Sequence, residues 1–304
     1  MKYLNIIQRL LFNPHCSYCN WLTALQRKTV DVSFNQSLLI VTVAFNKPEL
    51  IEKQIELVKR YCMDPSYKHV IVDNSTNKKA RKSIEDICSR NFIDYIPVPQ
   101  LPNKLSRTRF FWYCASEGIA LNWFWNILMQ KYKDAVGVNE SGKKSINHPR
   151  YFAIIDHDLL PFKDFSLVEK ISGKDFYGVD RHRDDTWYLW PGYLMLDLDA
   201  VKSRDIDFMP CFVGKTFLDT GGRNWHALYK DYQRKPEMFA KDKTIRLDNT
   251  KELRSQNDIY HRDCIQIIDG AWVHLVNGSN YAKLKGKDKF MMKVIRNLDK
   301  LAEL

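Results

Sequence analysis

Apolar runs and helical periods alternate along the first third of the chain. Three short runs rich in β-branched residues have the pattern of buried strands and lie at residues 38–44, 69–72 and 93–98. Between them, residues 48–58 and 79–88 carry apolar residues on one helical stripe, and Pro48 stands where a helix start tolerates proline. This order predicts a parallel α/β sheet with right-handed crossovers, in which ligands bind beyond the carboxyl ends of the strands.

The pattern changes after residue 100. We predict a long helix from Ser106 to about Tyr132, and then a buried strand at residues 151–155. Further strands are predicted at residues 176–179, 187–198 and 271–276, the second of them interrupted at Pro191-Gly192. The fold class is therefore α/β, with a mixed central sheet flanked by helices. We place this domain at residues 37–280, between a basic extension at residues 1–36 and a basic amphipathic helix at residues 281–304.

Composition and charge narrow the function classes. In 304 residues, 45% are hydrophobic and 27% charged, which is ordinary for a folded globular protein and argues against disorder. The net charge of +11 favours phosphate-bearing partners, although a basic surface that aids solubility explains it equally well. Residues 1–30 contain four basic residues and no acid. Because the basic residues are dispersed and no nucleic-acid reading motif is present, we expect no nucleic-acid partner.

The cysteines point to a reducing compartment. Seven are scattered along the chain, which does not resemble a disulfide framework. His15, Cys16 and Cys19 could supply zinc ligands, but no second pair follows at suitable spacing, so buried thiols are the simpler interpretation. No secretory signal is evident. The apolar stretch at residues 111–129 includes Glu117 and predicts a buried helix, because its polar groups would be costly in lipid.

The strongest chemical signal is Asp156-His157-Asp158 at the end of an apolar strand. Alternation along an extended segment would send both carboxylates to the same side, where they can share one hard divalent cation. Mg²⁺ or Mn²⁺ there would neutralise charge on a departing diphosphate. Surface acids or turn formers are the plainer alternative. The apolar residues on both sides favour burial, and a buried carboxylate needs a compensating cation.

Three motifs in order carry a family resemblance. Residues 41–46, residues 70–75 and Asp156-His157-Asp158 after a strand resemble the GT-A glycosyltransferases, particularly the family-2-like branch. The resemblance covers roughly residues 37–280 and rests on short motifs. It implies a GT-A-like (Rossmann-like) fold with Asp156 and Asp158 as metal ligands. It also implies a set of residues that bind the nucleotide sugar: Thr42, Ala44, Asn46, Asp73, Lys104 and Arg107.

The second half offers weaker candidates. His274, near the end of a strand, resembles the late histidine that closes some GT-A metal sites, although a structural histidine is the more common case. Asp219 stands where the family places an acid on the acceptor side, so it is our candidate base, but it could instead cap a helix or start a turn. Four aromatic residues lie close together in the sequence: Trp187, Tyr188, Trp190 and Tyr193. They could form a surface on which the sugar ring of an acceptor stacks, or they could pack in the core.

The resemblance implies an enzyme. We expect a metal-dependent hexosyltransferase that uses a nucleotide-diphosphate sugar, UDP-linked by family expectation, and Mn²⁺ or Mg²⁺. The acceptor would be a glycan or a lipid-linked precursor in polysaccharide biosynthesis. We expect a cytoplasmic protein, whose tail helix either lies at the inner face of the membrane or packs on its own domain. The alternatives are a haloacid-dehalogenase-like phosphatase and a non-catalytic binder of nucleotide sugars or carbohydrates. The sequence carries no glycine-rich dinucleotide or P-loop motif.

Overall fold

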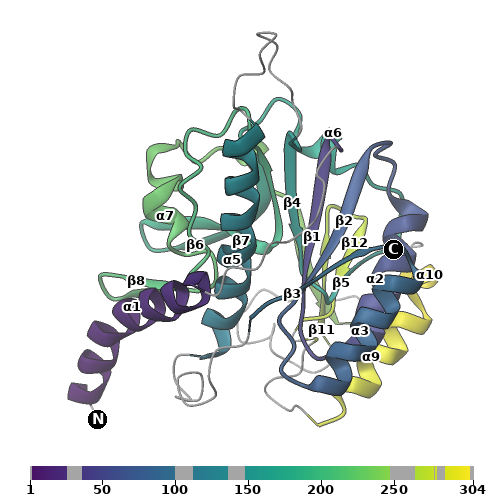
Figure 1. The fold of residues 1–304 in the computed structure, drawn as a ribbon, viewed down its shortest axis with the longest axis horizontal. Helices are drawn as coiled ribbons and strands as arrows, with labels where there is room; N and C mark the ends of the chain where they lie inside the picture. The colour runs from purple at the N-terminus through teal and green to yellow at the C-terminus, as the bar shows by residue number, and fades with distance from the viewer. Residues whose placement is uncertain are drawn as a thin grey trace.

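A six-stranded mixed sheet forms the centre of the protein. The computed structural model describes residues 2–25, 36–99, 112–135, 148–246, 264–276, 278 and 285–301. The sheet has the order β3-β2-β1-β4-β7-β6 (Figure 1). Its strands are β1 (Leu38–Ala44), β2 (Tyr67–Asp73), β3 (Asp94–Pro97), β4 (Tyr151–Ile155), β6 (Phe176–Arg183) and β7 (Thr186–Asp197). The first four run parallel, and β7 pairs antiparallel with β4 and with β6. The predicted mixed α/β sheet is confirmed.

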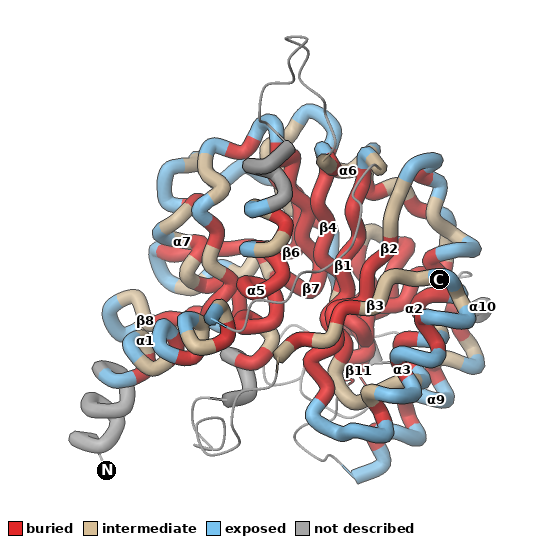
Figure 2. The backbone as a smooth tube through the Cα atoms, in the orientation of Figure 1, coloured by how far each residue is buried: buried red, intermediate tan, exposed pale blue. Residues whose placement is uncertain are grey.

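Helices cover both faces of this sheet because β1 is apolar on both sides. Leu39 and its odd-numbered neighbours pack with α5 (Trp112–Ala135). Leu38 and Ile40 share a cluster with Val58 of α2 (Pro48–Tyr61), and α3 (Lys78–Arg90) packs beside α2. Figure 2 shows the strands as buried and the outer helix faces as exposed. Among the described residues no helix is long and apolar enough to cross a membrane. The predicted burial of α5 is observed directly, since Ala120, Leu121 and Phe124 lie in the core.

A second sheet lies beside the first. It is antiparallel, with the order β10-β11-β12-β5, and comprises β10 (Asp242–Arg246), β11 (Cys264–Ile268), β12 (Trp272–His274) and β5 (Leu159–Pro161). The tail helix α9 (Lys287–Arg296) continues into α10 (Leu298–Leu301). Phe290, Met291 and Val294 of α9 pack in one cluster with residues of this sheet and of α2. The apolar side of the tail helix is therefore packed on its own domain, while Met292 of the same helix is exposed.

The basic extension forms a helix that the sequence pattern did not predict. This helix, α1 (Lys2–Leu25), packs against α5 and against the hairpin of β8 (Cys211–Val213) and β9 (Thr216–Leu218). Cys16 and Cys19 lie inside this contact, and the described cysteines are all free thiols. Burial raises the pKa of Cys16 to about 12. A thiol that keeps its proton is a poor zinc ligand, so the buried-thiol interpretation fits the structure.

The interruption predicted in β7 is a bulge within a continuous strand. Gly178 pairs with Leu194, but Asp180 pairs with Leu189, so extra residues of β7 lie opposite Val179. Within this bulge the carbonyl of Gly192 accepts a hydrogen bond of 2.9 Å from the amide of Asp156. The bulge therefore lies directly beside the first aspartate of the Asp-His-Asp motif. The remaining short helices are α6 (Leu167–Ile171), α7 (Asn224–Ala227), η1 (Tyr229–Asp231) and η2 (Pro236–Met238).

Candidate functional site

The Asp-His-Asp motif lies where the chain passes from the central sheet into the second sheet. β4 ends at Ile155 and β5 begins at Leu159. The amide of Leu159 donates to the carbonyl of Asp156 at 3.0 Å, so residues 156–159 form a tight turn. Our assumption of an extended segment was wrong, because the chain turns to enter the second sheet. The turn nevertheless brings Asp156 and Asp158 together, since ligand atoms of both lie within the same 4.8 Å group.

His274 completes this group because of strand register. His274 of β12 pairs with Leu159 of β5, the residue directly after Asp158. The next amide, that of Leu275, donates to the carbonyl of Asp158 at 2.8 Å. Among the residues that the structure describes, Asp156, Asp158 and His274 are the one group of three or more ligating side chains close enough to share a metal ion. The sequence-based candidates for a metal site therefore converge in space.

Contacts of both ring nitrogens orient His274 toward Asp158. Its Nδ1 lies 3.0 Å from Oε1 of Gln266, whose amide nitrogen donates to Asp242. Because that contact fixes the Gln266 amide, its oxygen faces the imidazole and Nδ1 must carry the proton. In a neutral ring Nε2 then presents a lone pair to Oδ1 of Asp158, 3.4 Å away.

Asp158 has one oxygen without a partner. Its Oδ2 accepts a hydrogen bond of 2.7 Å from the amide of Gly278, whereas its buried Oδ1 accepts none. Two acceptor atoms that face each other repel unless a proton or a metal ion lies between them. Carboxylate oxygens and imidazole suit a divalent ion such as Mn²⁺. The donor set and the orphaned oxygen therefore fit a divalent cation.

The surroundings keep Asp158 ionised despite its burial. Burial alone raises the pKa of Asp158, but when His274 carries a proton on Nε2 its attraction, helped by His157 and by the Gly278 amide, lowers that pKa to about 2. His157 is also buried, and its Nδ1 lies 2.9 Å from Oδ1 of Asp156. A carboxylate that is already ionised can bind a metal without first losing a proton.

A buried glutamine holds the turn of residues 156–159, which we call the metal turn, in place. The amide nitrogen of Gln54, on α2, donates to the carbonyls of Asp156 and Leu159, both at 2.7 Å. The hydroxyl of Thr42 donates to Oε1 of Gln54 at 2.8 Å and lies 3.0 Å from Nε2 of His69. Burial lowers the pKa of His69 to about 4, so its ring is neutral and can donate to that hydroxyl. Thr42, a predicted nucleotide-binding residue, thus supports the turn from inside the core.

Asn46 joins the carboxyl ends of β1 and β2. Its side-chain oxygen accepts from the amides of Thr76 and Asn77, at 3.0 and 2.9 Å. The backbone amide of Asn46 donates to the hydroxyl of Ser75 at 2.8 Å. Asn46 has a φ of 55°, a conformation that asparagine adopts more readily than most residues. The side chain predicted to touch the nucleotide therefore shapes the edge where a nucleotide would lie.

Asp73 is engaged within the protein. One oxygen accepts from the hydroxyl of Tyr95 at 2.7 Å, and the other accepts from the amide of Ser75 at 2.8 Å. The guanidinium of Arg81 lies 3.5 Å from it as an ion pair. The carboxylate is fully buried, as is the neighbouring candidate Ala44. In this structure Asp73 organises the loop at the end of β2, and its predicted contact with a nucleoside stays a prediction.

Glu117 is a site residue that the sequence analysis missed. It lies in the first turns of α5, next to Ser116, whose backbone and side-chain oxygens accept from the amide of Asn74 at the end of β2. Burial raises the pKa of Glu117 well above its usual value, and the charges of Asp156, Asp219 and Asp158 raise it further. Glu117 therefore lies near enough to three other carboxyl groups to be affected by their charges. In the sequence, Glu117 stood out as an acid within an apolar helix, but we used it only as evidence that the helix is buried in the protein.

Asp219 is one of the carboxyl groups whose charge affects Glu117. It is exposed, its Oδ1 accepts from the amide of Thr220 at 2.8 Å, and its carbonyl accepts from the amide of Gly222 at 2.7 Å. These are the contacts of a residue that starts a turn, which was one of the two interpretations of Asp219. Its charge nevertheless acts on Glu117, so the turn also brings an acid to the site. Lys104 and Arg107 lie outside the described residues.

The aromatic group divides between the core and the site. Trp187, Tyr188 and Tyr193 are buried, and Trp187 packs against Tyr229 at 5.0 Å between ring centroids. Core packing therefore explains these three. Trp190 is partly exposed, and its ring lies 4.6 Å from that of His274. It is the member of the group that remains available to a ligand at the candidate metal site.

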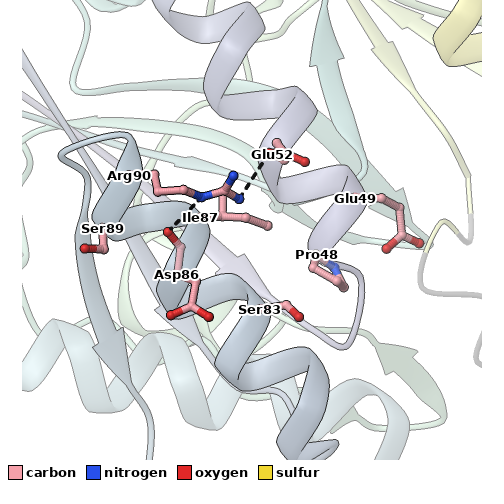
Figure 3. Close-up of a pocket in the computed structure, with 8 residues that line it drawn as sticks. All are labelled: Pro48, Glu49, Glu52, Ser83, Asp86, Ile87, Ser89 and Arg90. Carbon is pink, nitrogen blue, oxygen red and sulfur yellow. Dashed lines mark hydrogen bonds and ion pairs between the residues drawn. The ribbon is translucent and has the colours of Figure 1, made fainter.

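A separate hollow lies between α2 and α3 (Figure 3). It encloses about 790 Å³ and is lined by Pro48, Glu49, Glu52, Ser83, Asp86, Ile87, Ser89 and Arg90. Arg90 crosses it to form an ion pair with Glu52 at 3.4 Å. None of its lining residues belongs to the Asp156–Asp158–His274 group, so this hollow is distinct from the candidate site.

Gly278 is expected to be essential for the geometry of the site. A Cβ atom at this position would lie 2.3 Å from Cβ and 2.6 Å from Oδ2 of Asp158. The backbone of Gly278 does not need a left-handed conformation, so alanine fails there through this collision alone. We expect Gly278→Ala to displace the Asp158 carboxylate and to weaken Mn²⁺ binding about 10-fold or more, as measured by titration calorimetry. Gly173→Ala is the control for a loss of stability without a collision, since Gly173 has a φ of 74° but no atom within 4 Å of an added Cβ. Unchanged affinity in Gly278→Ala would contradict the expectation.

Comparisons with known proteins found similarity only among solved structures. No protein-family model matches the sequence, and no curated protein matches it. A structure of the mannosyltransferase Ktr4p from S. cerevisiae is 10% identical with a TM-score of 0.30, over 62% of this chain and 66% of that chain. The mannosyltransferase PcManGT from Pyrobaculum calidifontis, in complex with GDP-Man and Mn²⁺, is 11% identical with a TM-score of 0.33, over 66% and 59%.

A third match is the galactosyltransferase LgtC in complex with donor and acceptor sugar analogues. It is 12% identical with a TM-score of 0.30, over 53% of this chain and 58% of that chain. This chain therefore spans less than two thirds of the length of each of the three structures. The fold class rests on the strand order, and the candidate site rests on its side-chain geometry.

Proposed function

We propose that the protein is a metal-dependent glycosyltransferase of the GT-A type, which moves a hexose from a nucleotide-diphosphate sugar to a glycan or lipid-linked acceptor. The observation that carries this proposal is the group of Asp156, Asp158 and His274 at the carboxyl edge of β4. Parallel α/β sheets bind their ligands at this edge. The structures of similar topology include transferases of nucleotide sugars, and we propose a UDP-linked donor from the motif resemblance.

The side chains have distinct proposed roles. Asp156, Asp158 and His274 would hold Mn²⁺ or Mg²⁺, which when bound stabilises negative charge on the leaving diphosphate. Asn46 and the loop that Asp73 organises would form the part of the site that binds the nucleoside. Thr42 and Ala44 would support this part from the buried strand β1. Lys104 and Arg107 would contact the diphosphate.

Glu117 and Asp219 are the proposed groups on the acceptor side. Asp219 remains our candidate for the base that takes the proton of the acceptor hydroxyl. Glu117 would accept the same proton in turn, because burial and nearby carboxylates raise its pKa and so make it a better proton acceptor than an ordinary carboxylate.

The sequence alternatives fit this geometry less well. A phosphatase of the haloacid-dehalogenase type needs the first aspartate free as a nucleophile. Here Oδ1 of Asp156 is engaged by the amide and by the ring of His157, at 2.8 and 2.9 Å. A non-catalytic binder could use the metal ligands, but it would not need the nearby Glu117, whose pKa is raised.

The proposal predicts that donor binding depends on metal. Full-length protein would be heated with UDP-, GDP- and CMP-sugars in the presence of Mn²⁺ or of a chelator. A correct donor at about 100 times its Kd stabilises the folded state by about 2.7 kcal/mol, which raises the Tm by several degrees. We expect a UDP-hexose to do so only with Mn²⁺, and release of UDP on incubation to accompany it. If no nucleotide sugar shifts the Tm, or if the shift is the same in chelator, the proposal is wrong.

A further inference from the structure

The N-terminal helix α1 has two apolar faces. One face consists of Phe12, Cys16, Cys19 and Thr23, which are buried against the domain. The other, which we call the outer stripe, consists of Leu11, Pro14, Tyr18, Trp21 and Leu25, all exposed. The outer stripe repeats at intervals of three and four residues, so its members fall within about 80° of arc on a helix of 3.6 residues per turn, roughly opposite the buried face.

The outer stripe is a long apolar surface. Leu11, Trp21 and Leu25 are 57, 56 and 60% exposed, and Tyr18 is 47% exposed. The rings of Tyr18 and Trp21 stack with centroids 6.0 Å apart, which forms one continuous aromatic ridge. At 1.5 Å per residue the stripe is about 21 Å long. Figure 1 shows α1 at the edge of the molecule, with its N-terminal end pointing away from the sheets.

The charge of the N-terminal sequence indicates what would cover the outer stripe. Residues 1–30 contain Lys2, Arg9, Arg27 and Lys28 and no acidic residue. A second copy of the chain would bring two such basic segments together in a symmetric contact, which is unfavourable. An anionic lipid surface attracts the same charges, and tyrosine and tryptophan side chains favour the headgroup region of a bilayer.

We propose that α1 binds the protein to an anionic membrane surface, with the outer stripe buried among the lipid headgroups. A helix lying in the plane of the interface inserts its apolar side while basic residues contact phosphates. In α1 the opposite face stays packed on the domain through Phe12, whose ring lies 5.5 Å from that of Phe212. The helix therefore connects the catalytic domain rigidly to the bilayer. This inference is independent of the proposed function, because it needs neither metal nor donor.

Vesicle binding of the full-length protein tests this proposal. The probes are vesicles of phosphatidylcholine alone and of phosphatidylcholine mixed with phosphatidylglycerol, pelleted with the protein at low salt. We expect binding to the mixed vesicles and at least about 10-fold weaker binding to the neutral ones. Trp21→Ser combined with Leu25→Ser should reduce binding to the mixed vesicles about 10-fold or more, since both residues are exposed and their apolar contact with lipid is lost.

The matched control is Phe92→Ser. Phe92 is 96% exposed in the turn between α3 and β3, so this variant removes a comparable apolar side chain outside α1 and should bind as the wild type does. If the double variant unfolds at lower temperature than the wild type, Tyr18→Ser alone provides the comparison. Equal binding by outer-stripe variant and wild type overturns the proposal. A wild-type dimer in sedimentation velocity that the double variant converts to monomer also overturns it, because the stripe is then an interface between copies.

Discussion

Replacing Asp158 with asparagine should lower sugar transfer at least about 100-fold and leave the protein folded. Asparagine has the shape of aspartate, and its oxygen can still accept from the amide of Gly278. Its new amide group can donate to Nε2 of His274, 3.4 Å from the present Oδ1. The pair then no longer needs a cation between its members. The negative charge that would hold Mn²⁺ is lost, and so is its repulsion of Glu117.

The measurements for this variant separate activity from stability. We expect titration calorimetry to show Mn²⁺ affinity reduced by about 10-fold or more, while the Tm of the metal-free protein stays the same or rises. Asp164→Asn is the matched control, since Asp164 is exposed six residues further along the chain and should tolerate the same change. Transfer by Asp158→Asn at a rate within about threefold of the wild type would refute the assignment of Asp158 as a metal ligand.

Replacing Gln54 with leucine should destabilise the protein by roughly 2–4 kcal/mol, since it leaves buried acceptors without donors. The carbonyls of Asp156 and Leu159 both lose the amide group that donates to them at 2.7 Å. The hydroxyl of Thr42 loses Oε1 of Gln54 as its acceptor and keeps only its contact with Nε2 of His69. Water cannot replace these contacts easily, because Gln54, Thr42 and His69 are all buried.

Gln54→Leu should also weaken the metal site, because the turn between Asp156 and Leu159 loses its support. We expect a lower free energy of unfolding in denaturant titrations and a Mn²⁺ affinity reduced about 10-fold. Gln233→Leu, at an exposed glutamine, is the control and should change stability by less than about 0.5 kcal/mol. If Gln54→Leu unfolds at the same denaturant concentration as the wild type, the hydrogen bonds of Gln54 do not hold the turn.

Local patterns predicted the elements that lie near one another in the sequence. The apolar run Leu38–Ala44 predicted β1, because a strand buried on both faces is apolar at every position. The apolar stripe that begins at Pro48 predicted α2, because a helix buried on one face repeats its apolar residues every three or four positions. The pair Asp156 and Asp158 was recognisable for a similar reason, since two acids inside an apolar run are costly without a cation. The helix α1 was not predicted, and it contains Pro14, a residue that normally interrupts a helix.

Other features depend on contacts between distant segments. Glu117 reaches the carboxylates only because α5 packs across the central sheet, and Gln54 reaches the metal turn only because α2 lies against its start. No spacing in the sequence links residue 54 to residue 156. Trp190, which is partly exposed, likewise lies in the bulge of β7, which the sequence indicated only as an interruption of the strand.

The sequence by itself therefore determined the strands and helices between residues 38 and 98 and the pair of acids at the end of β4, because periodic burial and local charge are properties of neighbouring residues. The tertiary structure decided the rest of the site. Strand register between β12 and β5 placed His274 beside Asp158, and helix packing brought Gln54 and Glu117 to the same turn. Such contacts join residues that are tens of positions apart, and more than a hundred for Gln54 and His274, so their energies arise only when the whole chain has folded.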